Sequence, residues 1–215
     1  MNDQSKTFGP TIQGMLYKLK MIQAVASNIA NAATLGYKRE IPESIDFKSV
    51  LSSITDKPLR DNTSGQFQKT GNKLDLAIEG NAYFLIEDKD DVVTTRNGRF
   101  HINEKGQLVT QDDKEVVVIE KTDKPINLST TYDIKIERTG EIFVGTEKYG
   151  RIAMRIDDNK PVKVHQGYVE GSNVNLVDEM ILLTTAFRSF EVSEKALGME
   201  ASADRELIER YGRNV

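Results

Sequence analysis

The chain has 215 residues, of which 38% are hydrophobic and 29% charged, so it can bury one or two modest cores. A net charge of −4 gives no basic field for nucleic acid, and the absence of Cys excludes disulfides, thiolate metal sites and Cys nucleophiles. We expect no nucleic-acid partner. We also expect no membrane insertion, since no apolar run is long enough to cross a bilayer. The N-terminal stretch MNDQSKTFGP has no apolar core of a secretory signal, so we expect no cleaved signal peptide.

The first predicted element is a helix from residue 11 to about 33. Its apolar residues follow one another at steps of three and four, which predicts a heptad seam typical of a coiled coil. The seam residues are Ile12, Met15, Leu19, Ile22, Ala26, Ile29 and Ala33. The stretch SNIANAATLGYKRE then ends this helix, and Gly36 suits the left-handed conformation that follows a helix C-terminus.

The pattern from residue 37 to 62 predicts an extended connector with one short helix near 46–54, because Pro42 and Pro58 interrupt it. From 63 to 169 short alternating segments and turn residues predict antiparallel strands. Examples are Leu74–Leu76–Ile78 and the Asn97–Gly98 turn. This segment is therefore expected to form a sandwich or barrel-like β domain.

A second helix is expected from about 176 to 210, with Asn175 as its N-cap and acidic residues in its first turn. Its predicted seam contains Leu176, Met180, Leu183, Phe187, Phe190 and Leu197. The expected fold class is α+β, with paired N- and C-terminal heptad helices flanking a central antiparallel β domain. The expected divisions are 1–36, 37–62, 63–169 and 170–215.

Four motifs resemble the signatures of bacterial flagellar rod and hook proteins. Asn28, Ala30, Asn31, Thr34, Gly36, Tyr37 and Lys38 match N-N-x-A-N-x-x-T-x-G-[YF]-K, with Ser27 in place of the first Asn. TGNKLDLAIEGNAYFLI (70–86) matches a second motif, with Ala82 replacing the usual Gly. TTRNGRFHINEKGQLVT (94–110) and HQGYVEGSNVNLVDEMILL (165–183) match two more.

This resemblance implies a structural subunit of the basal-body rod that polymerises through its terminal helices into a helical axial tube and transmits torque. It also implies a periplasmic rod location, export through the flagellar export apparatus without a cleaved signal, and partners that are copies of itself and other rod and hook proteins. The two predicted seams would form the assembly interface. Asn28, Asn31, Thr34, Gly36, Tyr37 and Lys38 would form a corner at the exit of the first helix.

Charged residues on the two helices suggest cross-subunit ion pairs, although exposed pairs of this kind add little. The basic set is Lys18, Lys20, Lys38 and Arg39, and the acidic set is Asp178, Glu179, Glu191 and Glu194. The alternative to a rod subunit within the family is a hook-type axial protein. The alternative from another class is an enzyme or binding module built on the β domain.

Few residues suggest chemistry. His101 and His165 lack metal-ligand spacing, Asp75 and Glu79 fall in a turn or strand-end motif, and Ser193 and Ser202 have no base nearby in the sequence. The glycines Gly71, Gly80, Gly98 and Gly106 do not form a phosphate-binding loop. We therefore expect no catalytic residue, no metal and no cofactor.

Overall fold

A computed structural model describes residues 8–41, 59–89, 91–122, 134–158 and 160–212. The expected short helix near 46–54 lies outside these residues. The chain divides into two compact units. The helical unit comprises 1–30, 40–61 and 175–215, and the β unit comprises 31–39 and 62–174. The four-part division expected from the sequence stays a prediction.

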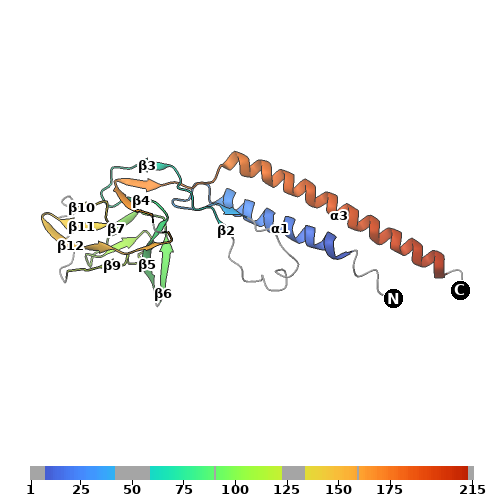
Figure 1. Ribbon diagram of the computed structural model, residues 1–215, viewed down its shortest axis with the longest axis horizontal. Coiled ribbons are helices and arrows are strands. Elements are labelled where there is room, and N and C mark those ends of the chain that lie inside the picture. The colour runs from blue at the N-terminus through green and yellow to red at the C-terminus, as the bar shows by residue number, and fades with distance from the viewer. Residues whose placement is uncertain (1–7, 42–58, 90, 123–133, 159, 213–215) are drawn as a thin grey trace. The chain divides into compact units, whose positions relative to one another are not determined.

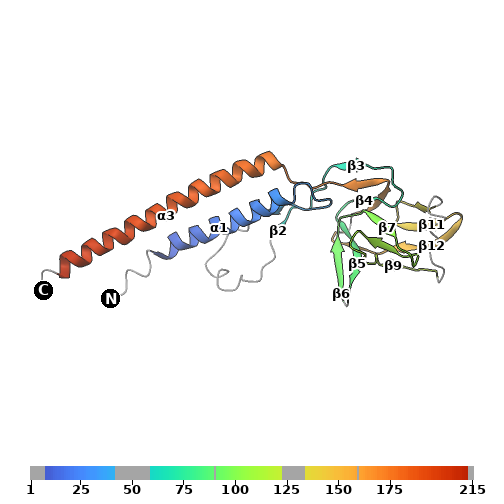
Figure 2. The ribbon, with the colours of Figure 1, turned by 180° about the vertical axis from the view of Figure 1, so that it is seen from behind.

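In its described residues the helical unit has two long helices and one small strand pair. Helix α1 spans Phe8–Ala30 and helix α3 spans Leu176–Gly212, while strands β1 (Glu40–Ile41) and β2 (Leu59–Arg60) pair antiparallel. Figures 1 and 2 show α1 and α3 side by side. The helices run antiparallel, because Asn28 of α1 contacts Glu179 near the start of α3, whereas Lys18 contacts Ser189 further along it.

The N-terminus of α3 follows ordinary capping rules. The Asn175 carbonyl accepts the Glu179 N–H at 3.0 Å, and the Asn175 side chain accepts the Val177 N–H at 3.1 Å. Asp178 and Glu179 occupy the first turn, where acidic side chains favour the helix dipole. The expected start of this helix is therefore confirmed by its hydrogen bonds.

The β unit is built from short strands whose pairings are all antiparallel. One sheet has the order β10-β11-β12-β9, another has the order β13-β5-β6, and three pairs are β14-β4, β15-β3 and β7-β8. The bounds are β3 Phe67–Lys69, β4 Leu76–Glu79, β5 Ala82–Asp88, β6 Asp91–Thr95, β7 Phe100–Ile102, β8 Leu108–Thr110, β9 Val118–Ile119, β10 Ile134–Ile136, β11 Glu141–Val144, β12 Glu147–Ile152, β13 Met154–Ile156, β14 Lys163–Gln166 and β15 Tyr168–Glu170.

One hydrophobic core holds the strands of the β unit together. Leu76, Ile78 and Phe84 are fully buried, and the Phe84 ring meets Phe100 edge-on with 5.1 Å between centroids. Alternation places these side chains on one face, because successive residues of a strand point to opposite sides. The core contains the alternating positions that the sequence indicated, Leu74, Leu76 and Ile78.

The expected fold class, however, is wrong. The described elements are mostly short β-strands in several small sheets, with one helix before them and one after, and the two helices are unequal at 23 and 37 residues. The helices do not bury a heptad seam. The buried helix positions include Ala24, Val25, Asn28, Glu179 and Ala186, whereas Leu19 is 40% and Phe187 49% exposed.

The physical reason is that each helix carries more than one apolar stripe. A three-and-four spacing identifies a stripe along a helix, but it does not identify the neighbour that covers it. Small and polar side chains, together with Val25, occupy the buried helix positions here, and several large apolar side chains are exposed.

Candidate functional site

The chain leaves α1 through a compact turn that begins at Asn31. The Thr34 N–H donates to the Asn31 carbonyl at 3.0 Å, the Thr34 hydroxyl donates to the Asn31 side-chain oxygen at 3.2 Å, and the Tyr37 N–H donates to the Thr34 carbonyl at 3.3 Å. Asn and Thr suit such turns because their short side chains bond to the local backbone. Asn31, Thr34 and Tyr37 therefore form a single local turn in the β unit.

Gly36 occupies the tightest point of this turn. Its φ is 68°, and its N–H donates to the Glu170 carbonyl at 2.8 Å. A Cβ added at Gly36 would lie 2.4 Å from the carbonyl carbon of Arg96 and 2.6 Å from the Asn97 nitrogen. Both the left-handed backbone and the close approach therefore require glycine here.

Lys38 reaches a buried carboxylate in the same unit. Its Nζ donates to Glu170 Oε1 at 2.7 Å and to the Thr63 carbonyl at 2.7 Å, and the Gly65 N–H donates to the same Oε1 at 2.9 Å. On the other side, Arg96 Nη1 lies 3.5 Å from Glu170 Oε2. The three charged side chains are at most 3% exposed.

Arg96 is held mainly by backbone carbonyls and by an aromatic ring. Its guanidinium donates to Ile78 O at 2.9 Å and to Gly80 O at 2.6 Å, and lies 5.4 Å from the centroid of Tyr83. The cluster thus holds two cations and one carboxylate. Glu170 is the central member, because it neutralises both Lys38 and Arg96 and also accepts a backbone N–H.

Asn173 fastens the end of the same turn. Its Oδ1 accepts the Arg39 N–H at 2.7 Å, and its Nδ2 donates to the Thr63 carbonyl at 3.1 Å. Its own N–H donates to the Tyr37 carbonyl at 3.4 Å. The sequence prediction named Lys38 but missed Arg96, Glu170 and Asn173. The sequence did contain a signal for these three residues, because all of them lie within the quoted motifs. Arg96 and Glu170 are also charged residues beside apolar strands.

Asn28 belongs to the other unit. Its Nδ2 donates to the Glu40 carbonyl at 3.0 Å and to Glu179 Oε2 at 3.2 Å, and its Oδ1 accepts the Glu40 N–H at 2.7 Å. Asn28 is 0% and Glu179 1% exposed. Asn28 of α1 therefore contacts both β1 and α3. The other residues of the predicted corner lie together in the β unit: Asn31, Thr34, Gly36, Tyr37 and Lys38.

The predicted assembly residues are distributed over two faces of the helices. Leu19, Ala26, Leu176, Met180 and Phe187 are exposed; Met15, Ile22, Ile29, Leu183, Phe190 and Leu197 are half-buried; and the side chain of Ile12 lies outside the described part of the chain. Their role in assembly stays a prediction. On α3 the exposed group is extended by Val177, Ile181 and Val192.

Several charged side chains proposed for cross-subunit pairs have partners within the chain. Lys18 donates to the Ser189 carbonyl at 3.0 Å and to the Ser193 hydroxyl. Lys38 contacts Glu170, and Glu179 contacts Asn28. These internal contacts leave less charge available to a neighbouring subunit.

Among the residues considered for chemistry, His165 and Glu79 lie in contact. His165 Nε2 donates to Glu79 at 2.8 Å, and this bond holds the pKa of Glu79 below its ordinary value of 4.5, with Lys163 lowering it further. His101 lies 3.4 Å from Asp113, while Asp75 accepts from Asn72 at 3.1 Å. Within the described residues no group of three or more potential ligands surrounds a metal position, and no helix could span a membrane.

The chain matches both family models and individual known proteins. A family model described as the flagellar hook protein FlgE/F/G D1 domain matches residues 77–144, and one described as the flagellar basal body rod FlgEFG protein C-terminal matches 165–209. The flagellar basal-body rod protein FlgF of Caulobacter vibrioides is 30% identical, with 89% of this chain and 92% of that protein covered.

Two further relatives have similar coverage. The FlgF protein of Mesorhizobium japonicum is 28% identical over 90% of this chain and 92% of its own length. The FlgG rod protein of Agrobacterium fabrum is 30% identical over 86% of this chain and 91% of its own length. The similarity therefore extends over nearly the whole of each protein.

Proposed function

The chain belongs to the flagellar basal-body rod family and is a structural subunit of that rod; we propose that it polymerises through α1 and α3 into a helical axial tube that transmits torque. The observation that carries this proposal is the exposed apolar face of α3. Met180 is 51%, Ile181 61% and Phe187 49% exposed. Contiguous exposed apolar side chains of this size mark an interaction surface.

The arrangement of α3 supports contacts on two sides. One side carries Glu179 and Ala186 and packs against α1, while Leu176, Met180 and Phe187 lie on a different side. Burying one such side chain contributes about 1.5–3 kcal/mol. A helical tube needs two different patches that meet without closing a ring, and an apolar helix face supplies one of them.

The Asn28–Glu179 contact gives the helical unit a defined register. A buried polar pair loses its hydrogen bonds if one helix slides by a turn, so it favours a single alignment over the neighbouring ones. We propose that this contact presents the apolar face of α3 in one fixed orientation relative to α1. A repeating assembly requires this, because each subunit must offer the same surface.

We propose that the turn from Asn31 to Arg39 is fixed firmly to the rest of the β unit. Within this segment, Gly36 donates to the Glu170 carbonyl and Lys38 contacts the Glu170 carboxylate, while Asn173 accepts from Arg39. Arg96 lies on the other side of the same carboxylate. A subunit that carries torque needs such a fixed attachment, because a loosely held segment would absorb the force.

The subunit acts at the basal body with other flagellar rod and hook proteins. We further propose a position in the periplasmic rod, export through the flagellar export apparatus without a cleaved signal, no insertion into the membrane and no enzymatic activity. The buried charges of Lys38, Glu170 and Arg96 contact each other and the backbone, which is the arrangement of a structural ion-pair cluster.

Phe187→Asp tests the proposed interface. The side chain is half-exposed in the single subunit, so the monomer should keep its helical content by circular dichroism. In an assembled tube the new carboxylate would be buried without a partner, and we expect loss of rod incorporation and motility. Val92→Asp, at a 58% exposed position of β6, is the matched control and should assemble. Normal incorporation of Phe187→Asp would refute this interface.

A further inference from the structure

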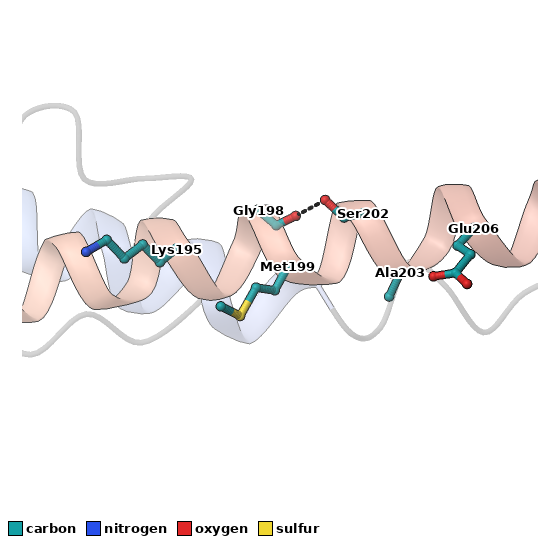
Figure 3. Close-up of a pocket in the computed structure, with 6 residues that line it drawn as sticks. All are labelled: Lys195, Gly198, Met199, Ser202, Ala203 and Glu206. Atoms are coloured by element: carbon teal, nitrogen blue, oxygen red, sulfur yellow. Dashed lines mark hydrogen bonds between the residues drawn. The ribbon is translucent and has the colours of Figure 1, made fainter.

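The open hollow on the second half of α3 is a poor ligand site. It has a volume of about 480 Å³, and its lining comes from α3 alone: Lys195, Gly198, Met199, Ser202, Ala203 and Glu206. Figure 3 shows the Ser202 hydroxyl donating to the Gly198 carbonyl within the helix, at 2.8 Å. A ligand would meet a single wall there, whereas binding sites enclose most of a ligand's surface.

The Asn97–Gly98 turn between β6 and β7 carries a more reactive pair. Asn97 is the one Asn in the sequence that is followed by Gly. Asn is a chemically labile residue, because the backbone nitrogen of the next residue can attack its side-chain amide carbon and close a succinimide ring. Glycine leaves that nitrogen least hindered, since it has no side chain. The pair is therefore chemically suited to spontaneous deamidation.

Deamidation of this pair consumes only water. The Gly98 nitrogen loses its proton and bonds to Asn97 Cγ, the Cγ–Nδ2 bond breaks, and Nδ2 leaves with that proton as ammonia. Water then opens the succinimide. Attack at Cγ breaks the new bond and leaves aspartate. Attack at the main-chain carbonyl carbon breaks the original peptide bond and leaves isoaspartate, whose backbone runs through the former side chain.

The folded β unit fixes both reacting groups. Asn97 Oδ1 accepts the Arg99 N–H at 3.1 Å, and the Leu76 N–H donates to the Gly98 carbonyl at 2.8 Å. Ring closure requires the planar Gly98 peptide to rotate until its nitrogen lies over Asn97 Cγ. Gly98 is buried so close to β4 that an added Cβ would overlap the Leu76 carbonyl oxygen. The rotation therefore requires β4 to separate from the turn.

We propose that Asn97 is a deamidation site gated by the opening of the β unit. In the folded subunit the reaction proceeds from molecules in which β4 has separated from Gly98, so its rate follows the population of that open state. In the unfolded chain it proceeds at the full rate of a free Asn–Gly pair. The gate depends on contacts within the β unit, and its test does not depend on the rod function.

The two products differ in their effect on the fold. Aspartate keeps an oxygen that can accept the Arg99 N–H, so the turn can form again. Isoaspartate adds a methylene to the backbone between Asn97 and Gly98, where the chain is packed from two sides. A Cβ at Gly36 would lie 2.6 Å from the Asn97 nitrogen, and Gly98 abuts the Leu76 carbonyl. Because a close-packed backbone has no space for an added group, isoaspartate keeps the turn from closing.

Ageing of the full chain tests the gate. Samples are kept at one mildly alkaline pH in buffer and in guanidinium chloride, and mass spectrometry follows the chymotryptic peptide that ends at Phe100. We expect Asn97 to deamidate at least about 100-fold more slowly in buffer. Glu170→Gln, which leaves the Asn97–Gly98 pair intact, should accelerate the reaction in buffer at least about tenfold and leave the rate in guanidinium chloride unchanged. Lys135→Gln, which removes an exposed charge in the same unit, is the matched control and should follow the parent.

Refolding of the aged chain tests the two products. Chain aged in guanidinium chloride is diluted into buffer and exposed briefly to protease, and electron-transfer fragmentation distinguishes aspartate from isoaspartate at residue 97. We expect isoaspartate to be depleted at least about tenfold, relative to aspartate, in the material that resists the protease. Asn103 is the internal reference: its Oδ1 also accepts the N–H two residues on, but Glu104 follows it, and it should deamidate far more slowly in guanidinium chloride.

Three results would each overturn the proposal. The first is an equal rate of Asn97 deamidation in buffer and in guanidinium chloride. The second is an unchanged rate in a Glu170→Gln subunit whose exchange protection has fallen. The third is equal recovery of aspartate and isoaspartate in the resistant β unit.

Discussion

Glu170→Gln should destabilise the β unit more than Lys38→Met does. Glu170 is almost fully buried and lies beside both Lys38 and Arg96. The substitution keeps the shape and one acceptor oxygen, so a hydrogen bond to Lys38 or to the Gly65 N–H can remain. It removes the carboxylate charge that lies beside both cations.

Breaking a buried ion pair by removing one partner costs about 3–5 kcal/mol, because the remaining charge stays desolvated. Two cations remain here, so we expect a loss in this range. A domain of this size is stable by only about 5–15 kcal/mol, and the change is therefore large. Lys38→Met should cost less, about 1–3 kcal/mol, because it leaves Arg96 and Glu170 as a one-to-one pair.

Hydrogen exchange followed by mass spectrometry measures the free energy of opening of the β unit separately from that of the helical unit. We expect faster exchange in peptides that cover β3, β4 and β15 in Glu170→Gln. Glu104→Gln, at an exposed turn position, should match the parent. The reasoning would be refuted if Glu170→Gln lost less than about 1 kcal/mol or less than Lys38→Met did.

Three other perturbations follow from the same contacts. Gly36→Val should open the Asn31–Arg39 turn while the core strands stay protected, since the new side chain meets backbone within 2.4 Å; unchanged protection of that turn would argue against the fixed attachment. Asn28→Leu should cost about 1–3 kcal/mol in the helical unit, because Glu179 loses a buried donor, and thermal unfolding by circular dichroism measures it; an unchanged midpoint would contradict the register role. The lowered pKa of Glu79 means that its bond to His165 stabilises the β4–β14 pair at pH above 4.5 and that this contribution is lost as pH falls below it. The protection of the β4–β14 amides, relative to the intrinsic exchange rate at each pH, should therefore fall in acid, and Glu79→Gln should flatten that dependence. An equally steep profile in the variant would exclude this bond as the cause.

The sequence predicted many local features because local rules decide them. Asn175 caps α3 as expected. Leu76 and Ile78 both lie in the core, because residues two apart in a strand point to the same side of the sheet. The start of α1 at Phe8 lies a few residues before the expected one, within the usual uncertainty of helix ends.

The fold class and the charged cluster depend on long-range contacts and were not predictable in the same way. On α3, Met180 and Phe187 follow one regular stripe, and Glu179 and Ala186 follow another. Spacing alone therefore does not reveal that Glu179 and Ala186 are the buried positions and that Met180 and Phe187 are exposed. Arg96 and Glu170 are far apart in sequence, and charged residues are normally exposed, so only the fold brings them together.

Electron cryomicroscopy of purified basal bodies tests the central claim most directly. The account predicts that this subunit appears in the rod as repeated copies, with α1 and α3 in the contacts between neighbouring subunits and the exposed face at Met180 and Phe187 buried there. A rod in which this chain is missing, or in which Met180 and Phe187 stay exposed to solvent in every copy, would contradict it.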